Sequence, residues 1–258
     1  MPIATRLLRP PLRRAQTLVV AGALPPAIVL GLIALVIGPV ESVVVFVVAA
    51  VLAASWLWRA GERRVVAALG GRPAGATTDA RLLNLVDGLC STAGLRPPRV
   101  IVTPHEGLNL LVAGRSADDG VVAVTTGLVE GLNRIELEGV LADGLVQIRR
   151  GDIIPATVAV ATFGLGARLA VGDGERDGEI DRAGVALTRY PPALVSAFET
   201  MQRRGTAVPG VPSSMAHLWL ADPRPAPGGA GSELGHSAPV PPSRRPGLAA
   251  RVSALRSL

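Results

Sequence analysis

Hydrophobic residues recur every three to four positions through residues 134–152, and this period predicts a buried helix. Its apolar face consists of Leu137, Leu141, Leu145 and Ile148. Asp143 and Gln147 interrupt the pattern four positions apart, so they project from successive turns of one face. Gly144 stands beside them, where a glycine costs a helix about 1 kcal/mol relative to alanine. These three positions are therefore the candidate site of the chain.

Two long apolar runs lie near the N-terminus and are typical of membrane-spanning helices. Residues 17–40 carry no charge and residues 43–58 form a second run, and one bilayer crossing needs about 20 apolar residues. Pro25 and Pro26 predict a kink in the first run. A cleaved signal peptide is the alternative, but the run is too long and lacks a small-residue cleavage site before a polar start. We expect a transmembrane helical hairpin.

Short β-branched runs separated by turn residues predict a small sheet before the central helix. The expected strands are 99–103, 109–114 and 121–125. A helix over 79–93, which Asp79 can cap, comes before the strands, and a short helix over 127–131 follows them. The fold class is therefore α+β, mostly α, with the small sheet inside a helical domain.

A third apolar run, residues 153–171, is long enough for one membrane crossing at most and carries Arg168. It is either a core helix or a helix at the membrane. The Pro/Gly/Ser-rich stretch 223–246 predicts a flexible loop, and an amphipathic basic helix is expected from Leu248. The expected parts are a basic N-terminus (1–16), the hairpin (17–58), a linker (59–78), the main domain (79–222), the loop (223–246) and the C-terminal helix (247–258).

The composition supports membrane insertion. Hydrophobic residues make up 49% of the 258 and charged residues only 18%. The net charge of +6 comes from arginines near both ends, and the middle of the chain is slightly acidic, which argues against a nucleic-acid-binding groove. Arginines flank both outer ends of the hairpin and none lies in its turn. The positive-inside rule therefore places both ends, and the bulk of the chain, in the cytoplasm at the cell membrane.

The single cysteine, Cys90, limits the chemistry open to the chain. One cysteine excludes an intrachain disulfide and a cysteine-based zinc cluster, and it fits a reducing compartment. Cys90 itself is expected in the core, as a small apolar residue.

The order of these parts resembles a known family. Residues 109–114, NLLVAG, match a segment that commonly reads N-A-F-A-x-G, and 122–129, VAVTTGLV, match V-V-x-T-x-G-L-L. The central helix matches one that reads E-L-x-A-V-L-A-H-E-x-x-H. The chain is thus similar to the HtpX-type membrane zinc metallopeptidases, which implies a cytoplasmic, zincin-like peptidase domain over 79–222.

The positions that carry the family's chemistry are changed. The resemblance puts the two zinc-binding histidines at Asp143 and Gln147 and the catalytic glutamate at Gly144. Two imidazoles at i and i+4 bind zinc from one helix face, and the adjacent glutamate acts as general base. Glutamine is a weak neutral ligand and glycine transfers no proton. No catalytic residue and no bound metal are therefore expected.

The third zinc ligand of the family is a glutamate in R-E-x-x-A-D, which puts Asp177 at the ligand position and Asp181 at the final aspartate. Asn109 and Arg150 are further candidate framework residues. A membrane crossing by 153–171 would separate Asp177 from Asp143, so the resemblance implies that this run stays on the cytoplasmic side.

The remaining histidines do not supply a replacement site. His105 lies between two strand signals, His217 has a structural position in the family, and His236 lies in the flexible loop. The family's late T-H-P-P segment has Arg245 in place of its histidine. No spacing among these residues is that of metal ligands.

Three hypotheses follow. In the first, the protein is a catalytically inactive pseudo-metallopeptidase that binds or regulates an active membrane protease or its substrates. In the second, it is an active metalloendopeptidase with an altered site, in which Asp143, Asp177 and Asp181 hold a hard cation and Glu179 or Glu175 is the base. If that site has only decayed, Asp143 is expected to pair with an arginine such as Arg150 or Arg182. In the third, the protein has an unrelated structural role in the membrane.

Overall fold

The computed structural model describes residues 9–34, 38–161, 174–224 and 246–257, with side chains from residue 12 in the first range and from residue 176 in the third. The predictions for Arg168, Glu175, His236, Arg245 and nearly all of the loop 223–246 lie outside this description. The helices are α2 (Arg9–Ala34), α3 (Pro39–Leu69), α4 (Ala80–Ala93), α5 (Thr126–Gly131), α6 (Arg134–Arg150), α7 (Ile153–Ala161), α9 (Gly174–Thr188), α10 (Pro191–Arg204), the 3-10 helix η1 (Ser213–Leu218) and α11 (Leu248–Arg256). The strands are β1 (Arg72–Pro73), β2 (Arg99–Thr103), β3 (Leu110–Gly114) and β4 (Gly120–Thr125).

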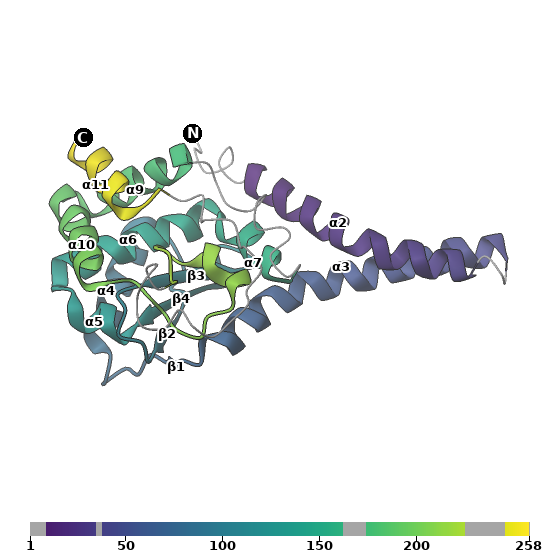
Figure 1. Cartoon of the computed structure of the whole chain (residues 1–258), viewed down its shortest axis with the longest axis horizontal. Helices are drawn as coiled ribbons and strands as arrows, with labels where there is room; N and C mark the ends of the chain where they lie inside the picture. Colours follow the sequence, from purple (N-terminus) through teal and green to yellow (C-terminus); the bar gives the residue numbers. More distant parts are fainter. Residues whose placement is uncertain (1–8, 35–37, 162–173, 225–245, 258) are drawn as a thin grey trace.

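The helices α2 and α3 pack side by side and project from the body of the protein (Figure 1). By length and composition both are apolar enough to cross a membrane, over Leu12–Ala34 and Pro39–Leu69. Many of their large apolar side chains are exposed, among them Val29, Leu32 and Val51. Contiguous exposed apolar surface on this scale marks a membrane or partner contact. The predicted pair of apolar helices is confirmed.

The boundary between the hairpin and the domain differs from the prediction. Residues 59–69, expected to be linker, continue α3 without a break, and the helix ends at Gly70 in the left-handed conformation (φ 56°). Arg72 and Pro73 then pair with β2 as the short antiparallel strand β1. The second apolar helix, α3, therefore continues into the body of the protein as one unbroken helix.

The body is built around a four-stranded mixed sheet in the order β1-β2-β4-β3. β2 pairs with β4 in parallel, with Val100 opposite Val122, and β3 returns antiparallel to β4, with Val112 opposite Val122. Every residue of β3 and β4 is buried. The three predicted main strands and the mostly helical α+β class are thus confirmed.

The alternation along each strand divides the core between the two faces of the sheet. Val100, Val122 and Val124 face the helices α4 and α6. Ile101, Val121 and Ala123 face the end of α3 and the η1 segment. The apolar run that begins at residue 153 supplies α7, which packs against α2, α3 and β3. Its described part is the buried core helix that was one of the two predicted outcomes.

The helix α4 begins where predicted, but Asp79 does not cap it. No backbone amide of the helix donates to the Asp79 carboxylate. Its Oδ2 accepts from the Gly75 amide at 2.7 Å, and the carboxylate pairs with the guanidinium of Arg72. The Arg72 hydrogen bond, followed by the Gly75 amide, lowers the pKa of Asp79 despite partial burial. The residue fixes the 70–79 turn rather than the helix end.

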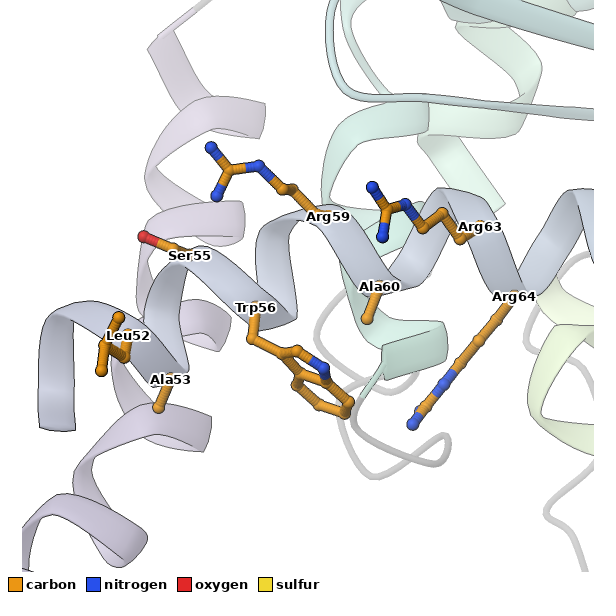
Figure 2. A pocket seen from close by; sticks show the side chains of 8 residues that line it. All are labelled: Leu52, Ala53, Ser55, Trp56, Arg59, Ala60, Arg63 and Arg64. Atoms are coloured by element: carbon orange, nitrogen blue, oxygen red, sulfur yellow. The ribbon is translucent and has the colours of Figure 1, made fainter.

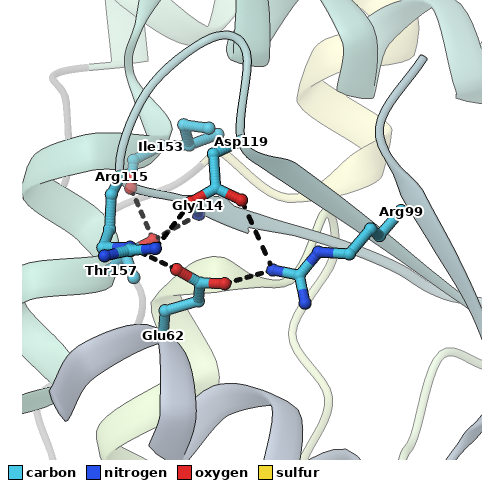
Figure 3. Close-up of polar contacts among 7 residues, drawn as sticks. All are labelled: Glu62, Arg99, Gly114, Arg115, Asp119, Ile153 and Thr157. Carbon is cyan, nitrogen blue, oxygen red and sulfur yellow. Dashed lines mark hydrogen bonds and ion pairs between the residues drawn. The ribbon is translucent and has the colours of Figure 1, made fainter. Parts of the chain in front are cut away.

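One carboxylate attaches the hairpin to the domain. Glu62, on α3, accepts hydrogen bonds from Arg99 at the start of β2 and from Arg115 after β3, and Asp119 lies within ion-pair distance of both arginines (Figure 3). Gly61 lies against α7 so closely that a Cβ there would sit 2.3 Å from the Thr157 carbonyl oxygen. Sequence reasoning did not predict this joint.

Replacing Glu62 with glutamine is expected to lower the free energy of unfolding by about 1–2 kcal/mol, because charge-assisted hydrogen bonds are lost. We expect no larger loss of stability because the Arg99 side chain is 54% exposed, so solvent screens the ion pair between Arg99 and Glu62. Thermal unfolding in detergent measures the effect. The exposed Glu130→Gln change on α5 is the control, expected within about 0.5 kcal/mol of wild type. Equal unfolding of the two variants would contradict the assignment.

Candidate functional site

The helix α6 is held firmly at both ends, so its site residues have fixed positions. Asn133 accepts from the amides of Ile135 and Glu136, and the Glu136 side chain accepts from the Asn133 amide, which completes a capping box. Gly151 ends the helix in the left-handed conformation at φ 75°. Residues 139–148 are buried between the sheet, α9 and α10.

Asp143 is completely buried, and its carboxylate contacts polar groups that include Gln147 and Arg251. The Gln147 side-chain amide donates to Oδ2 at 3.0 Å, and a guanidinium nitrogen of Arg251 approaches Oδ1 at 3.4 Å. The two residues that the pattern placed on successive turns therefore do meet. They do so as a hydrogen-bonded pair, with the Gln147 amide directed at Asp143.

Arg251 reaches this site from α11, at the C-terminal end of the chain. Its guanidinium makes a two-point contact with Asp181, with Nε 3.0 Å from Oδ2 and Nη2 bonded to Oδ1. Nη1 donates to the Leu220 carbonyl oxygen at 3.1 Å, and the guanidinium carbon lies 4.4 Å from the centre of the Phe198 ring. The side chain is 4% exposed, so this is a fully desolvated cation.

Nearby carboxylates keep this cation charged. Burial by itself lowers the pKa of the Arg251 guanidinium, but the charges of Asp143, Asp181 and Asp177 together outweigh burial and raise the pKa. Asp143 and Asp177 are two of the positions that the sequence resemblance assigned to metal ligands, and their charges help to raise the pKa of the Arg251 guanidinium.

The prediction that Asp143 pairs with Arg150 or Arg182 was wrong, because Asp143 pairs with Arg251. Arg150 instead bonds Glu179 at 2.7 Å and lies 3.3 Å from Asp152, at the edge of the site. Arg182 is exposed. The structural ion pair that was expected for a decayed site exists, but Arg251 supplies it. The helix that carries Arg251, α11, packs on α9 and α10.

The space beside Gly144 is filled by apolar side chains. A Cβ at this position would lie 2.9 Å from Leu110 Cδ2 and 3.2 Å from Val112 Cγ1, both on β3. Asp143 is crowded from the other side, where a Cβ on Gly184 of α9 would lie 3.2 Å from the Asp143 backbone. Any side chain at position 144 therefore requires the Leu110 side chain to shift and crowds Val112.

Asn109 has a structural task next to the site. Its side-chain amide donates to the carbonyl oxygens of Thr206 and Ala221, both at 2.9 Å. Its Oδ1 accepts from the amides of Leu110 and Ala221. Asn109 thus fixes the segment whose Leu220 carbonyl receives Arg251, and in this sense it is a framework residue.

The same segment covers part of the outer edge of the sheet. Trp219 forms an antiparallel bridge with Leu111 of β3, and the Leu220 amide donates to the Leu110 carbonyl oxygen at 2.8 Å. An open strand edge is a general docking site for extended peptides, because its backbone groups are available for pairing. On β3 the chain itself occupies those groups at this point.

The donor set does not suit zinc. Gln147 offers an amide that already donates to Asp143, and the Asp143 and Asp181 oxygens receive Arg251. A ring nitrogen of His217 contacts the Ala156 carbonyl oxygen at 2.8 Å. Among the described residues, no group of three or more His, Cys, Asp and Glu side chains is arranged to hold a metal ion. Zinc needs several deprotonated nitrogen, sulfur or oxygen donors at about 2 Å.

The fold and site together define a class: a helical domain with a small mixed sheet, joined to two apolar helices, whose central helix carries the buried pair Asp143 and Gln147. No protein-family model matches the chain. Comparison with curated proteins gives "Protease HtpX homolog" from Tropheryma whipplei at 29% identity, over 63% of this chain and 70% of that protein. The proteins of that name from Salinibacter ruber and Acidiphilium cryptum are 30% and 41% identical, over 63% and 36% of their own lengths. The chain is therefore similar to the HtpX-type proteases, as the resemblance in its motifs indicated.

Proposed function

We propose that this protein is a membrane-anchored, HtpX-like pseudopeptidase with a zincin-like domain that binds no zinc and hydrolyses no peptide bond. The observation that carries the proposal is the Arg251 guanidinium, which contacts Asp143 and Asp181 inside the site. Gly144, at the position of the family's general base, supports the same conclusion because it has no proton-transfer group. The Arg251 cation balances the charge of the buried Asp143 and Asp181 carboxylates.

The altered-site hypothesis receives less support. A hard cation at Asp143 and Asp181 would have to displace a buried guanidinium held by two-point hydrogen bonds. Glu179, the described candidate for a base, has a side chain that is 51% exposed and bonded to Arg150. The hypothesis of an unrelated membrane role is weakened by the similarity to HtpX-type proteases.

The proposed place of the protein is the cell membrane, with α2 and α3 inserted and the sheet-containing body in the cytoplasm. The exposed apolar surface of both helices supports insertion. With catalysis absent, the role left to the domain is binding. We propose as its partner an active membrane protease or a substrate of one, because the chain is similar to HtpX-type proteases.

Metal analysis and a protease assay test the proposal. Protein purified from membranes should contain far less than one zinc per chain, and it should leave casein intact with or without a chelator. An active HtpX-type protease prepared in the same detergent is the control for metal retention and activity. Stoichiometric zinc together with chelator-sensitive casein cleavage would overturn the proposal.

A further inference from the structure

A groove on α3 is separate from the site described above. It lies across the surface of the helix where its apolar stretch ends, and it has a volume of about 720 Å³. Its lining residues are Leu52, Ala53, Ser55, Trp56, Arg59, Ala60, Arg63 and Arg64. Small-molecule sites have volumes of about 300–1,000 Å³, so the groove has the size of a ligand site.

The groove has charged walls on a small-residue floor. Arg59 and Arg63 extend along one side, Trp56 and Arg64 along the other, and Ala60 lies between them (Figure 2). The Arg64 guanidinium lies 5.1 Å from the centre of the Trp56 ring and donates to the Ala161 carbonyl oxygen at 3.1 Å. One wall is therefore held in place by a cation–π contact.

The other wall carries positive charge that is not neutralised. Arg59 and Arg63 are exposed, and neither has an ion-pair partner within the part of the chain that the structure describes. Three guanidinium groups around one groove attract an anion with several oxygen acceptors. Guanidinium groups match phosphate oxygens in geometry and charge.

We propose that this groove binds the headgroup of an anionic phospholipid, with the phosphate held by Arg59 and Arg63. The position supports a lipid, because Leu52 and Ala53 continue the groove toward the apolar part of α3 and Trp56 is of the type that lies at the membrane interface. Basic residues next to a membrane helix attract anionic lipids. The inference rests on insertion of α3 in the membrane, and it is independent of the loss of zinc.

Native mass spectrometry of the full chain in detergent tests the proposal. Phosphatidylglycerol should bind at least about tenfold more tightly than phosphatidylcholine with the same acyl chains. The Arg59→Gln/Arg63→Gln variant should lose that preference, and Arg59→Lys/Arg63→Lys should keep part of it. The control is Arg134→Gln/Arg182→Gln, which removes the same charge from exposed positions outside the groove and should bind like wild type.

Three results would overturn the proposal. The first is equal binding of the two lipids by wild-type protein. The second is an unchanged preference for phosphatidylglycerol in the Arg59→Gln/Arg63→Gln variant. The third is a loss of that preference in the Arg134→Gln/Arg182→Gln control as large as in the groove variant. An added series with inorganic phosphate distinguishes the source of the anion. If inorganic phosphate at the same concentration as the lipid displaces it, the groove is a site for free phosphate rather than for a headgroup. Circular dichroism should show that all variants are folded, since all four arginines are exposed.

Discussion

Replacing Arg251 with alanine is expected to lower the free energy of unfolding by about 3–5 kcal/mol, because it leaves buried carboxylates without their cation. Asp143 and Asp181 have side chains that are 0% and 2% exposed, so water cannot replace the guanidinium without opening the core. For a chain of this size the loss corresponds to a decrease of roughly 10 °C in Tm. Thermal unfolding in detergent measures it.

The matched control for this prediction lies on the same helix. Arg256 also pairs with a carboxylate, that of Glu199, but its side chain is 66% exposed. Arg256→Gln should therefore change stability by less than about 1 kcal/mol. The triple change Arg251→Met/Asp143→Asn/Asp181→Asn removes the charges together and should recover much of the loss. If Arg251→Ala unfolds at the same temperature as Arg256→Gln, the guanidinium has no central role.

Restoring the zinc ligands is expected to restore zinc binding only when Arg251 is removed as well. The changes Asp143→His, Gln147→His and Asp177→Glu return the family's ligand types, but the Arg251 cation would repel a metal at the same place. With Arg251→Ala added, zinc at a thousandfold excess over its dissociation constant should stabilise the protein by about 4 kcal/mol. The readouts are Tm with zinc against Tm with chelator, and the zinc content of the protein.

Gly144→Glu is left out of this set for a structural reason. The glutamate would meet Leu110 and Val112 and would test repacking of β3 rather than metal binding. Equal zinc binding by the restored protein with and without Arg251 would show that the guanidinium does not occupy the metal position. No zinc binding in either form would show that the positions assigned from the family pattern do not converge.

The elements of the domain were predictable because their signals are local. The 3.6-residue period of 134–152, the β-branched run 99–103 and the apolar runs of the hairpin each depend on neighbouring residues only. The structure reproduces the central helix and this strand to within two residues, whereas the two hairpin helices begin at Arg9 and end at Leu69, outside the predicted runs. The candidate positions 143 and 147 were also visible locally, since they interrupt a regular pattern on one face.

The partners of those residues were not predictable from local patterns. Arg251 lies 108 positions from Asp143, and it stands in a short basic segment whose period suggests only an amphipathic helix. Arg150 was the nearer candidate in sequence, but it projects from α6 toward Asp152 and Glu179. The partners of Glu62 were also distant in sequence. Glu62 follows an apolar run, and a carboxylate at that place is typical of the end of a membrane helix.

The long separation of Arg251 from its partners has a consequence for the order of folding. Its contacts to Asp143 and Asp181 close loops of 108 and 70 positions, and contacts of this length form late because the chain must first pay the entropy of closure. Interactions absent from the transition state act mainly on the unfolding rate. The C-terminal arginine is thus expected to slow unfolding of the domain and to leave its folding rate nearly unchanged.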